Sequence, residues 1–186
     1  AWKYTIEDAA VMGQEFVVSP WLDESLRNTY DDFVGFMEVF NKSGELCQKS
    51  GMKFGYHNHD FEFSQKLNGE LVFDLIMQKT DADKVVLQLD MGNMYIAGAK
   101  AADIVNKYPG RFENIHVKDM IKSESEHGGF ESCILGKGLV GTKEVTDLSK
   151  AKGGTRVFVI EQESYQGKAP LDCMKEDLAI MKHWGY

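Results

Sequence analysis

Several features that mark common protein classes are missing from this chain of 186 residues. It has no long run of basic residues, and Asp and Glu outnumber Lys and Arg 29 to 21, which gives a formal net charge of −8. Binding to a phosphate backbone requires clustered Lys and Arg, so this composition argues against a nucleic-acid partner. No apolar stretch approaches the length of a membrane span, which argues against a membrane partner.

Cysteine is also scarce, with three residues at positions 47, 133 and 173. They are odd in number and far apart, so the spacing predicts neither a disulfide framework nor a CxxC metal knuckle. We expect small buried or half-buried side chains at all three positions. Residues 1–13 carry acidic side chains where a signal peptide has an apolar core, and they resemble the middle of a helix, so the sequence predicts no particular compartment.

The residues that are present alternate between strand-like and helix-like patterns. Short β-rich runs occur at 15–20, 53–59, 85–90, 114–119 and 156–163. Between them we predict four helices. The first begins near Thr29 with a capping-box-like Asp32 and ends before Gly51, the next two cover 72–79 and 101–108, and the last has a stripe of Leu171, Met174, Leu178 and Met181. This repetition predicts an α/β fold with a parallel sheet covered by helices.

Two architectures accept this pattern, an open doubly wound sheet and a closed (β/α)8 barrel. An open nucleotide-binding sheet usually has a glycine-rich turn after its first strand, but the run at 15–20 leads into WLDES, and Gly136 and Gly138 follow no strand. Metal-competent side chains instead follow nearly every strand, as expected at the mouth of a barrel. Five βα units make roughly five-eighths of a TIM barrel, so we expect residues 1–186 to be one barrel domain that is N-terminally incomplete.

The motifs at these strand ends resemble the sugar phosphate isomerase/epimerase family, a group of xylose-isomerase-like TIM barrels with a YHNH-signature subgroup. The resemblance covers essentially the whole chain, through EDAAVMGQEFVVSPW, GMKFGYHNHDFEF, QLDMGNMYIAGA, YPGRFENIHVKDM and VFVIEQE. It implies a metal-dependent sugar isomerase or epimerase. Relatives with the same barrel include inosose dehydratases and lyases that act on keto-glycosides, so the fold is implied more firmly than one reaction.

In the epimerase branch, a Glu, an Asp, a His and a second Glu hold one divalent metal ion. The resemblance places Asp90, His116 and Glu161 at the last three of these positions, and it places His57 where the family has its first Glu. His57, Asp90, His116 and Glu161 are therefore the predicted metal ligands. Two imidazoles and two carboxylates suit Mn, Co, Zn, Fe or Mg, and the nitrogen ligands favour a transition metal.

Loss of the first family Glu removes one proton-shuttling carboxylate. Glu161 remains as the leading catalytic base, and Glu62 or Glu163 is the candidate for the second. A carboxylate that removes a proton next to a carbonyl forms an enediolate, a step that isomerases, epimerases and eliminating lyases share. We expect His59, Asn93, Lys118 and Trp21 to contact the substrate, which we predict to be a small carbohydrate.

Each of these residues also has an ordinary structural interpretation. An isolated HxH in a strand is more often a pair of hydrogen-bonded core histidines, Asp90 could be a helix N-cap, and Lys118 and Asp119 could pair at the surface. Trp21 could cover the core instead of stacking on a sugar. The main functional alternative is a non-catalytic sugar-binding barrel, and the protein could also form a homo-oligomer. Phosphorylated substrates are disfavoured because Arg111 and Arg156 precede their strands.

Overall fold

The structure is a computed structural model that describes residues 2–124 and 127–186. Its five-stranded sheet has the order β1-β2-β5-β6-β9, and the pairs β1–β2, β2–β5 and β6–β9 are parallel. These strands are β1 (Phe16–Ser19), β2 (Lys53–His57), β5 (Val85–Asp90), β6 (Asn114–Val117) and β9 (Val157–Ile160). All five lie inside the runs predicted from the sequence.

The described helices are α1 (Trp2–Val11), α2 (Tyr30–Lys49), α3 (Phe61–Ser64), α4 (Val72–Lys79), α5 (Met91–Ile96), α6 (Ala101–Lys107), α7 (Thr142–Leu148) and α8 (Pro170–Trp184). Short 3-10 turns η1 (Glu24–Leu26) and η2 (His127–Gly129) and a π-helical turn η3 (Ser149–Gly153) accompany them. Two antiparallel hairpins are added, β3 (Lys66–Leu67) with β4 (Glu70–Leu71) and β7 (Asp119–Lys122) with β8 (Phe130–Cys133). No described helix is long and apolar enough to cross a membrane.

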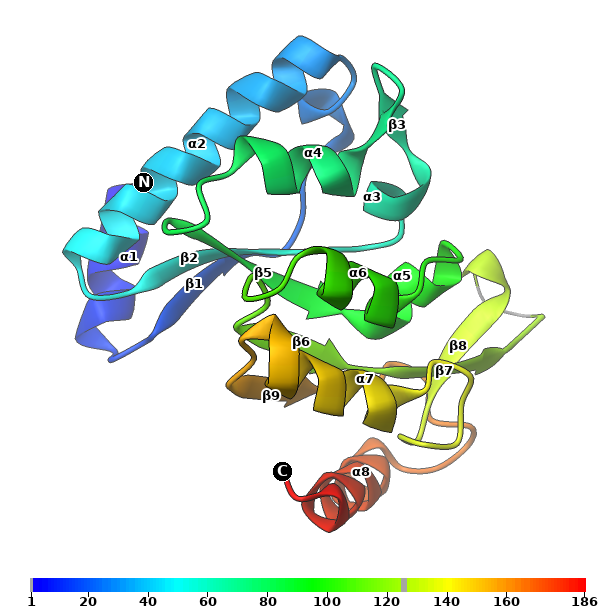
Figure 1. Cartoon of the computed structure of the whole chain (residues 1–186). Helices are drawn as coiled ribbons and strands as arrows, with labels where there is room; N and C mark the ends of the chain where they lie inside the picture. Colours follow the sequence, from blue (N-terminus) through cyan, green and yellow to red (C-terminus); the bar gives the residue numbers. More distant parts are fainter. Residues whose placement is uncertain (1, 125–126) are drawn as a thin grey trace. The chain divides into compact units, whose positions relative to one another are not determined.

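The chain divides into two compact units, Ala1–Gln88 and Leu89–Tyr186, and the division falls inside β5. That residues 1–186 are one incomplete barrel domain therefore stays a prediction. In the first unit, β1, β2 and the start of β5 pair in parallel, and α2 and α4 lie on the same side of β1 and β2 (Figure 1). Phe40 of α2 packs on Phe54 and Tyr56 of β2, with ring centroids 5.2 Å apart in both pairs.

Helix α2 begins where the sequence predicts. The hydroxyl of Thr29 accepts a hydrogen bond from the backbone N–H of Asp32 and so caps the first turn. Gly44 gives this helix its close approach to the segment before β5, because a Cβ at Gly44 would lie 2.3 Å from the carbonyl oxygen of Lys84. The predicted limits of α4 are confirmed, and α6 ends one residue earlier than predicted, with Tyr108 as its C-cap.

In the second unit, β6 and β9 pair with His116 opposite Val159, and α8 packs on β9 (Figure 1). The predicted apolar stripe of α8 is only partly buried, because Met181 is buried and Met174 half-buried but the two leucines are not. Leu171 and Leu178 are 66% and 47% exposed, whereas Cys173, Asp177 and Met181 face inward. The buried residues include the carboxylate of Asp177. It accepts a hydrogen bond from the backbone N–H of Leu135, which compensates for its burial. Hydrophobicity alone therefore did not predict which residues of this helix are buried.

Asp119 organises the β7–β8 hairpin, although the sequence analysis considered it as a surface residue. Asp119 is 1% exposed and accepts hydrogen bonds from the backbone N–H groups of Gly136, Gly138 and Val140, at 2.8 to 3.1 Å. A Cβ at Gly138 would lie 2.3 Å from Asp119 Oδ1, so the loop closes on the carboxylate only with glycine there. The surface pair of Lys118 and Asp119 is thus wrong, since both are buried and each has other partners. All three cysteines are buried and free, as predicted.

Candidate active site

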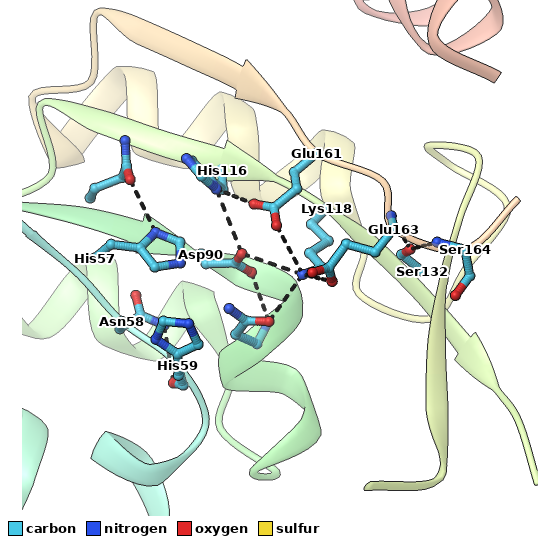
Figure 2. Close-up of polar contacts among 12 residues, drawn as sticks. His57, Asn58, His59, Asp90, His116, Lys118, Ser132, Glu161, Glu163 and Ser164 are labelled. Carbon is cyan, nitrogen blue, oxygen red and sulfur yellow. Dashed lines mark hydrogen bonds and ion pairs between the residues drawn. The ribbon is translucent and has the colours of Figure 1, made fainter. Parts of the chain in front are cut away.

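Polar side chains from β5, α5, β6 and the segment after β9 meet in the second unit. We call Asp90, Asn93, His116, Lys118, Glu161 and Glu163 the strand-end cluster. Figure 2 shows the Glu161 carboxylate directed toward both His116 and Lys118. Because parallel strands end at the same edge of their sheet, residues far apart in the sequence are brought within hydrogen-bond distance here.

Asp90 is the N-cap of α5, and its second oxygen lies near two basic side chains of the cluster. Its Oδ1 accepts a hydrogen bond of 2.7 Å from the backbone N–H of Asn93 and caps α5. Its Oδ2 lies 3.8 Å from His116 Nδ1 and 3.8 Å from Lys118 Nζ. The side chain is 0% exposed, and this burial raises the pKa of the carboxyl above its ordinary value, although the Lys118 charge opposes the shift. The N-cap role therefore leaves one oxygen directed at the cluster.

Lys118 is the buried cation of the cluster, with a side chain 2% exposed. Its Nζ lies 3.1 Å from Asn93 Oδ1, 3.3 Å from Glu161 Oε1 and 2.5 Å from Glu163 Oε2. The aliphatic part of Lys118 packs against Gly92, where a Cβ would lie 2.7 Å from Lys118 Cγ. A lysine buried to this extent is stable as a charged group only when carboxylates surround it, as they do here.

Glu161 contacts two basic side chains of the cluster. Its Oε2 contacts His116 Nδ1 and its Oε1 contacts Lys118 Nζ. Partial burial by itself would raise the pKa of Glu161, but the hydrogen bond with His116 and the Lys118 charge outweigh it and hold the pKa well below the ordinary value. Glu161 is thus an ionised carboxylate, with its side chain 25% exposed.

Within the first unit, His57 is buried at the end of β2. Its Nδ1 lies 3.0 Å from the side-chain oxygen of Gln88, its partner in the β2–β5 register. Because an amide oxygen only accepts, Nδ1 carries the proton in this contact and Nε2 carries the lone pair. This is the arrangement of a metal-ligating histidine, whose second nitrogen usually donates to a supporting group.

His59 lies in the same unit within an aromatic group. The ring of Trp21 meets the His59 ring edge-to-face at 4.6 Å and the Phe61 ring at 5.2 Å, and Trp21 is half-exposed. The guanidinium of Arg27 lies 3.7 Å from the centroid of Phe61, and its Nε donates to the backbone oxygen of Leu22. Trp21 therefore both packs on its neighbours and presents ring surface to solvent.

Glu62 is fully buried behind these residues. Its Oε1 accepts a hydrogen bond of 2.5 Å from the hydroxyl of Tyr56, and its Oε2 accepts one of 2.8 Å from the backbone N–H of His59. Burial raises the pKa of Glu62 to about 7, although these hydrogen bonds partly oppose the shift. Glu62 holds the chain that follows β2 in place, which is a structural task.

The donor atoms of the second unit fit a divalent metal ion. One ligand atom of Asp90 and one of His116 lie within 4.8 Å of each other. Glu161 Oε2 contacts His116 Nδ1, which is 3.8 Å from Asp90 Oδ2. A desolvated carboxylate beside an imidazole and a second carboxylate is a mixed O and N donor set, which suits Zn, Mn, Fe and Co better than Ca.

Sequence reasoning missed three residues that support these side chains, namely Gln88, Tyr56 and Ser132. Gln88 was detectable, because it is the polar residue two positions before Asp90 and side chains two apart share one face of a strand. Tyr56 and Ser132 gave no such signal. Their roles come from contacts with Glu62 and with the segment after β9.

This combination of a parallel α/β fold and metal-competent strand ends defines a class of barrel proteins, and comparison with known proteins identifies the family. Residues 1–184 match the family model described as "Xylose isomerase-like TIM barrel", so the chain belongs to this family. The match, with the five-stranded sheet, confirms the predicted family and the predicted fold class, an α/β fragment of a TIM barrel.

Individual relatives agree with this assignment. The chain is 25% identical over 166 residues to an inosose dehydratase of Geobacillus thermodenitrificans, covering 83% of this chain and 54% of that protein. A sugar phosphate isomerase/epimerase from Parabacteroides distasonis has a similar structure, with a TM-score of 0.80, 24% identity, and coverage of 97% of this chain and 62% of that one. The IOLI protein, solved with a binding zinc atom, has a TM-score of 0.75 at 14% identity, covering 98% and 67%. The chain thus spans about half the length of this curated relative.

Proposed function

We propose that this chain carries the active site of a divalent-metal-dependent enzyme that removes a proton next to the carbonyl of a sugar or keto-sugar. The observation that carries the proposal is the strand-end cluster, where the ionised Glu161 touches both His116 and the buried cation Lys118. A sugar enzyme is what membership in the family supports. When bound, a divalent ion would polarise the carbonyl and acidify the neighbouring C–H.

The proposed metal ligands are His57, Asp90, His116 and Glu161. His57 is included because the resemblance places it where the family has its first Glu. Its partner in the β2–β5 register is Gln88, which precedes Asp90 by two residues in the sequence. In its contact with Gln88 the Nδ1 of His57 is the donor, so Nε2 is the nitrogen that would bind the metal ion.

Glu161 is the proposed base. It is ionised, so it can accept a proton, and a quarter of its side chain is exposed, so a substrate can reach it. His116 is a weaker candidate, because an imidazole nitrogen that binds a metal through its lone pair cannot accept a proton. The Lys118 ammonium would stabilise negative charge that develops on a substrate oxygen.

Of the two candidates for a second proton-transfer group, the contacts favour Glu163. Its side chain is 67% exposed and pairs with Lys118, so it lies next to the proposed base. Glu62 is 0% exposed and both of its oxygens are engaged by Tyr56 and His59. Without a path to solvent or substrate, Glu62 is better suited to positioning the turn.

The proposed substrate contacts are Lys118, Asn93, His59 and Trp21. Lys118 and Asn93 would orient substrate oxygens, because the Lys118 ammonium and the Asn93 amide already bond to each other beside Glu161. Trp21 offers a half-exposed ring for the C–H face of a sugar, with His59 against its edge. Arg27 is engaged with the Leu22 backbone and Gln65, which favours a neutral substrate over a phosphorylated one.

The fate of the enediolate decides the reaction class. Return of the proton to another carbon or face gives an isomerase or epimerase, whereas loss of a hydroxyl or glycosidic oxygen gives a lyase. Curated relatives such as that of Geobacillus thermodenitrificans are named inosose dehydratases, which favours the second outcome as the alternative to test. A non-catalytic sugar-binding barrel would keep the substrate contacts at the strand ends but would not need a proton-abstracting carboxylate.

Deuterium exchange tests the shared first step. The purified protein, loaded in turn with Mn, Co, Zn, Fe or Mg, is incubated in deuterated water with a panel of ketoses, inososes and keto-glycosides. We expect deuterium in the carbon next to the carbonyl of at least one substrate, and water loss from that substrate would identify a dehydratase.

Two variants make the result specific. Glu161→Gln keeps the size of the side chain and removes the base, so exchange should fall by about 100-fold or more. Glu38→Gln makes the same change on the exposed face of α2 and should leave exchange unchanged. Retained exchange in Glu161→Gln would reject Glu161 as the base. Absence of exchange with every substrate, despite bound metal, would favour the sugar-binding alternative.

A further inference from the structure

The segment that carries Glu161 and Glu163 is held by one buried serine on the neighbouring hairpin. Ser132 of β8 is 2% exposed, and its hydroxyl oxygen accepts hydrogen bonds from the backbone N–H groups of Glu163 and Ser164, at 2.7 and 2.8 Å (Figure 2). Two consecutive amides converge on one oxygen, so the direction of the chain is fixed at the point where the Glu163 side chain leaves it. Nothing in the proposed chemistry requires a hydroxyl group at this place.

The backbone of Ser132 makes a third hydrogen bond to this segment, with the side chain of Gln166. The side-chain amide of Gln166 donates to the backbone oxygen of Ser132 at 2.8 Å. Gln166 has φ +45°, a left-handed conformation that costs a residue other than glycine roughly 1 kcal/mol or more. In this conformation the side chain of Gln166 reaches the backbone of Ser132, which adds a third hydrogen bond between Ser132 and the segment.

Ser132 itself is held in place by the β7–β8 strand pairing. It pairs with Met120 in the β7–β8 ladder, next to the pair of Asp119 with Cys133. Asp119 is the carboxylate that gathers three backbone N–H groups of the loop 136–140. The hairpin therefore makes two sets of hydrogen bonds. Asp119 binds the loop 136–140, and Ser132 binds the segment after β9.

At the other end of this connection is the ammonium group of Lys118. Besides Asp90 at 3.8 Å, three acceptors lie within 3.3 Å of this nitrogen, on Asn93, Glu161 and Glu163. Glu163 is the nearest of them and the most exposed, with its side chain 67% exposed. An exposed glutamate loses much side-chain entropy in such a contact, so a fixed backbone at Glu163 makes the contact more favourable.

We propose that Ser132 is a positioning residue of this active site, which holds Glu163 on Lys118 through the backbone amides of Glu163 and Ser164 and thereby orients Lys118 toward Glu161. The inference rests on the proposed function only for its effect on catalysis. The physical connection from Ser132 to Lys118 is a claim about the folded protein, and it can be tested without a substrate.

Amide exchange tests the connection itself. Ser132→Ala removes the acceptor of two amides, so the amides of Glu163 and Ser164 should exchange with deuterated water about 10-fold faster or more. Ser132→Thr retains a hydroxyl and should restore slow exchange. Ser43→Ala removes a buried serine hydroxyl that bonds to Val39 in α2, and it should leave both amides unchanged. Unchanged protection in Ser132→Ala would overturn the proposal.

A double-mutant cycle tests the effect on catalysis. With the substrate found by deuterium exchange, Ser132→Ala should lower kcat by about 10- to 100-fold with little change in KM, because displaced catalytic groups cost rate without removing substrate contacts. Since Ser132 acts through Glu163, adding Ser132→Ala to Glu163→Gln should cause no further loss. Multiplying losses in the double variant would overturn the proposed route through Glu163.

The two proposals fail in distinguishable ways. If no substrate shows exchange in the unmodified protein, the proposed function fails, and the amide measurement still decides whether Ser132 holds the segment. If the unmodified protein is active and Ser132→Ala is equally active with faster amides, Ser132 is a structural residue only, and the positioning role is rejected. A thermal unfolding curve of each variant confirms that it is folded.

Discussion

Buried charges dominate this protein at the scale of single residues. Lys118 and Asp90 have almost no exposed surface, and each has an opposite charge or a polar partner at close range. Removing one member of such a group leaves a desolvated charge behind, which is more costly than losing a surface ion pair. The residues of the proposed chemistry are thus also residues on which the stability of the second unit depends.

Glu62 gives a prediction about pH and stability. Burial raises its pKa to about 7 in the folded protein, from a value near 4.5 in the unfolded chain. At pH values between 4.5 and 7, Glu62 is ionised in the unfolded chain and still protonated in the folded protein. Its contribution to stability is therefore full below pH 4.5 and is lost as the pH rises through 7. Glu62→Gln stays neutral, so its stability relative to the unmodified protein should rise by about 2 to 3 kcal/mol between pH 5 and pH 8.

Urea unfolding of both proteins at each pH measures this difference. Gln keeps the size of Glu but offers one acceptor oxygen instead of two, so at pH 5 the variant should be less stable by about 1 kcal/mol. Tyr56→Phe is the matched control, because it removes the hydroxyl that donates to Glu62 and leaves the carboxyl able to titrate. A constant difference between Glu62→Gln and the unmodified protein across this pH range would show that the carboxyl has no raised pKa.

At the scale of elements, α2 shows how one helix is fixed both by its own residues and by its neighbours. The cap at Thr29 sets its first turn, and its apolar face, with Phe33, Met37 and Phe40, is buried. These features are local and periodic. How closely the helix packs depends instead on Gly44. The backbone of Lys84 occupies the space that a side chain at this position would need.

Two glycines on this helix give opposite predictions. Gly44→Ala places a Cβ 2.3 Å from the Lys84 carbonyl oxygen, a backbone atom that cannot rotate away, so it should destabilise the protein by about 2 kcal/mol or more. Gly35→Ala meets no atom within 4 Å and should stabilise it by about 0.5 to 1 kcal/mol through helix propensity. Denaturant unfolding measures both changes. Equal effects of the two substitutions would show that α2 does not approach Lys84 this closely.

At the scale of the whole molecule, the expected outcome concerns metal. We expect the purified protein to retain about one transition-metal ion per chain, and a chelator to lower its thermal unfolding midpoint, because a ligand that binds only the folded state adds about 2.7 kcal/mol at 100 times its dissociation constant. His57→Ala should weaken metal binding by about 10-fold or more. His183→Ala, on α8, is the matched control and should bind metal normally.

Elemental analysis and calorimetric titration with Zn and Mn measure this prediction. Full metal content in His57→Ala together with loss of metal in His116→Ala would limit the site to the second unit, with Asp90 and Glu161 as the remaining ligands. Failure of the unmodified protein to bind any of these ions would reject the metal proposal. The activity of the whole protein is tested separately, because this chain spans about half the length of its curated relative.

The sequence by itself determined the five strands, the start of α2 and the limits of α4, because these depend on local periodicity and on a local cap. It also identified Asp90, His116 and Glu161 as strand-end residues, since a parallel βα order brings strand ends to one edge. Only the tertiary structure decided which face of α8 is buried and that Asp119 closes the loop 136–140. The hydroxyl of Ser132 accepts its hydrogen bonds from residues 31 and 32 positions away. Hydrogen bonds between such distant residues leave no periodic signal in the sequence, so only the folded chain reveals them.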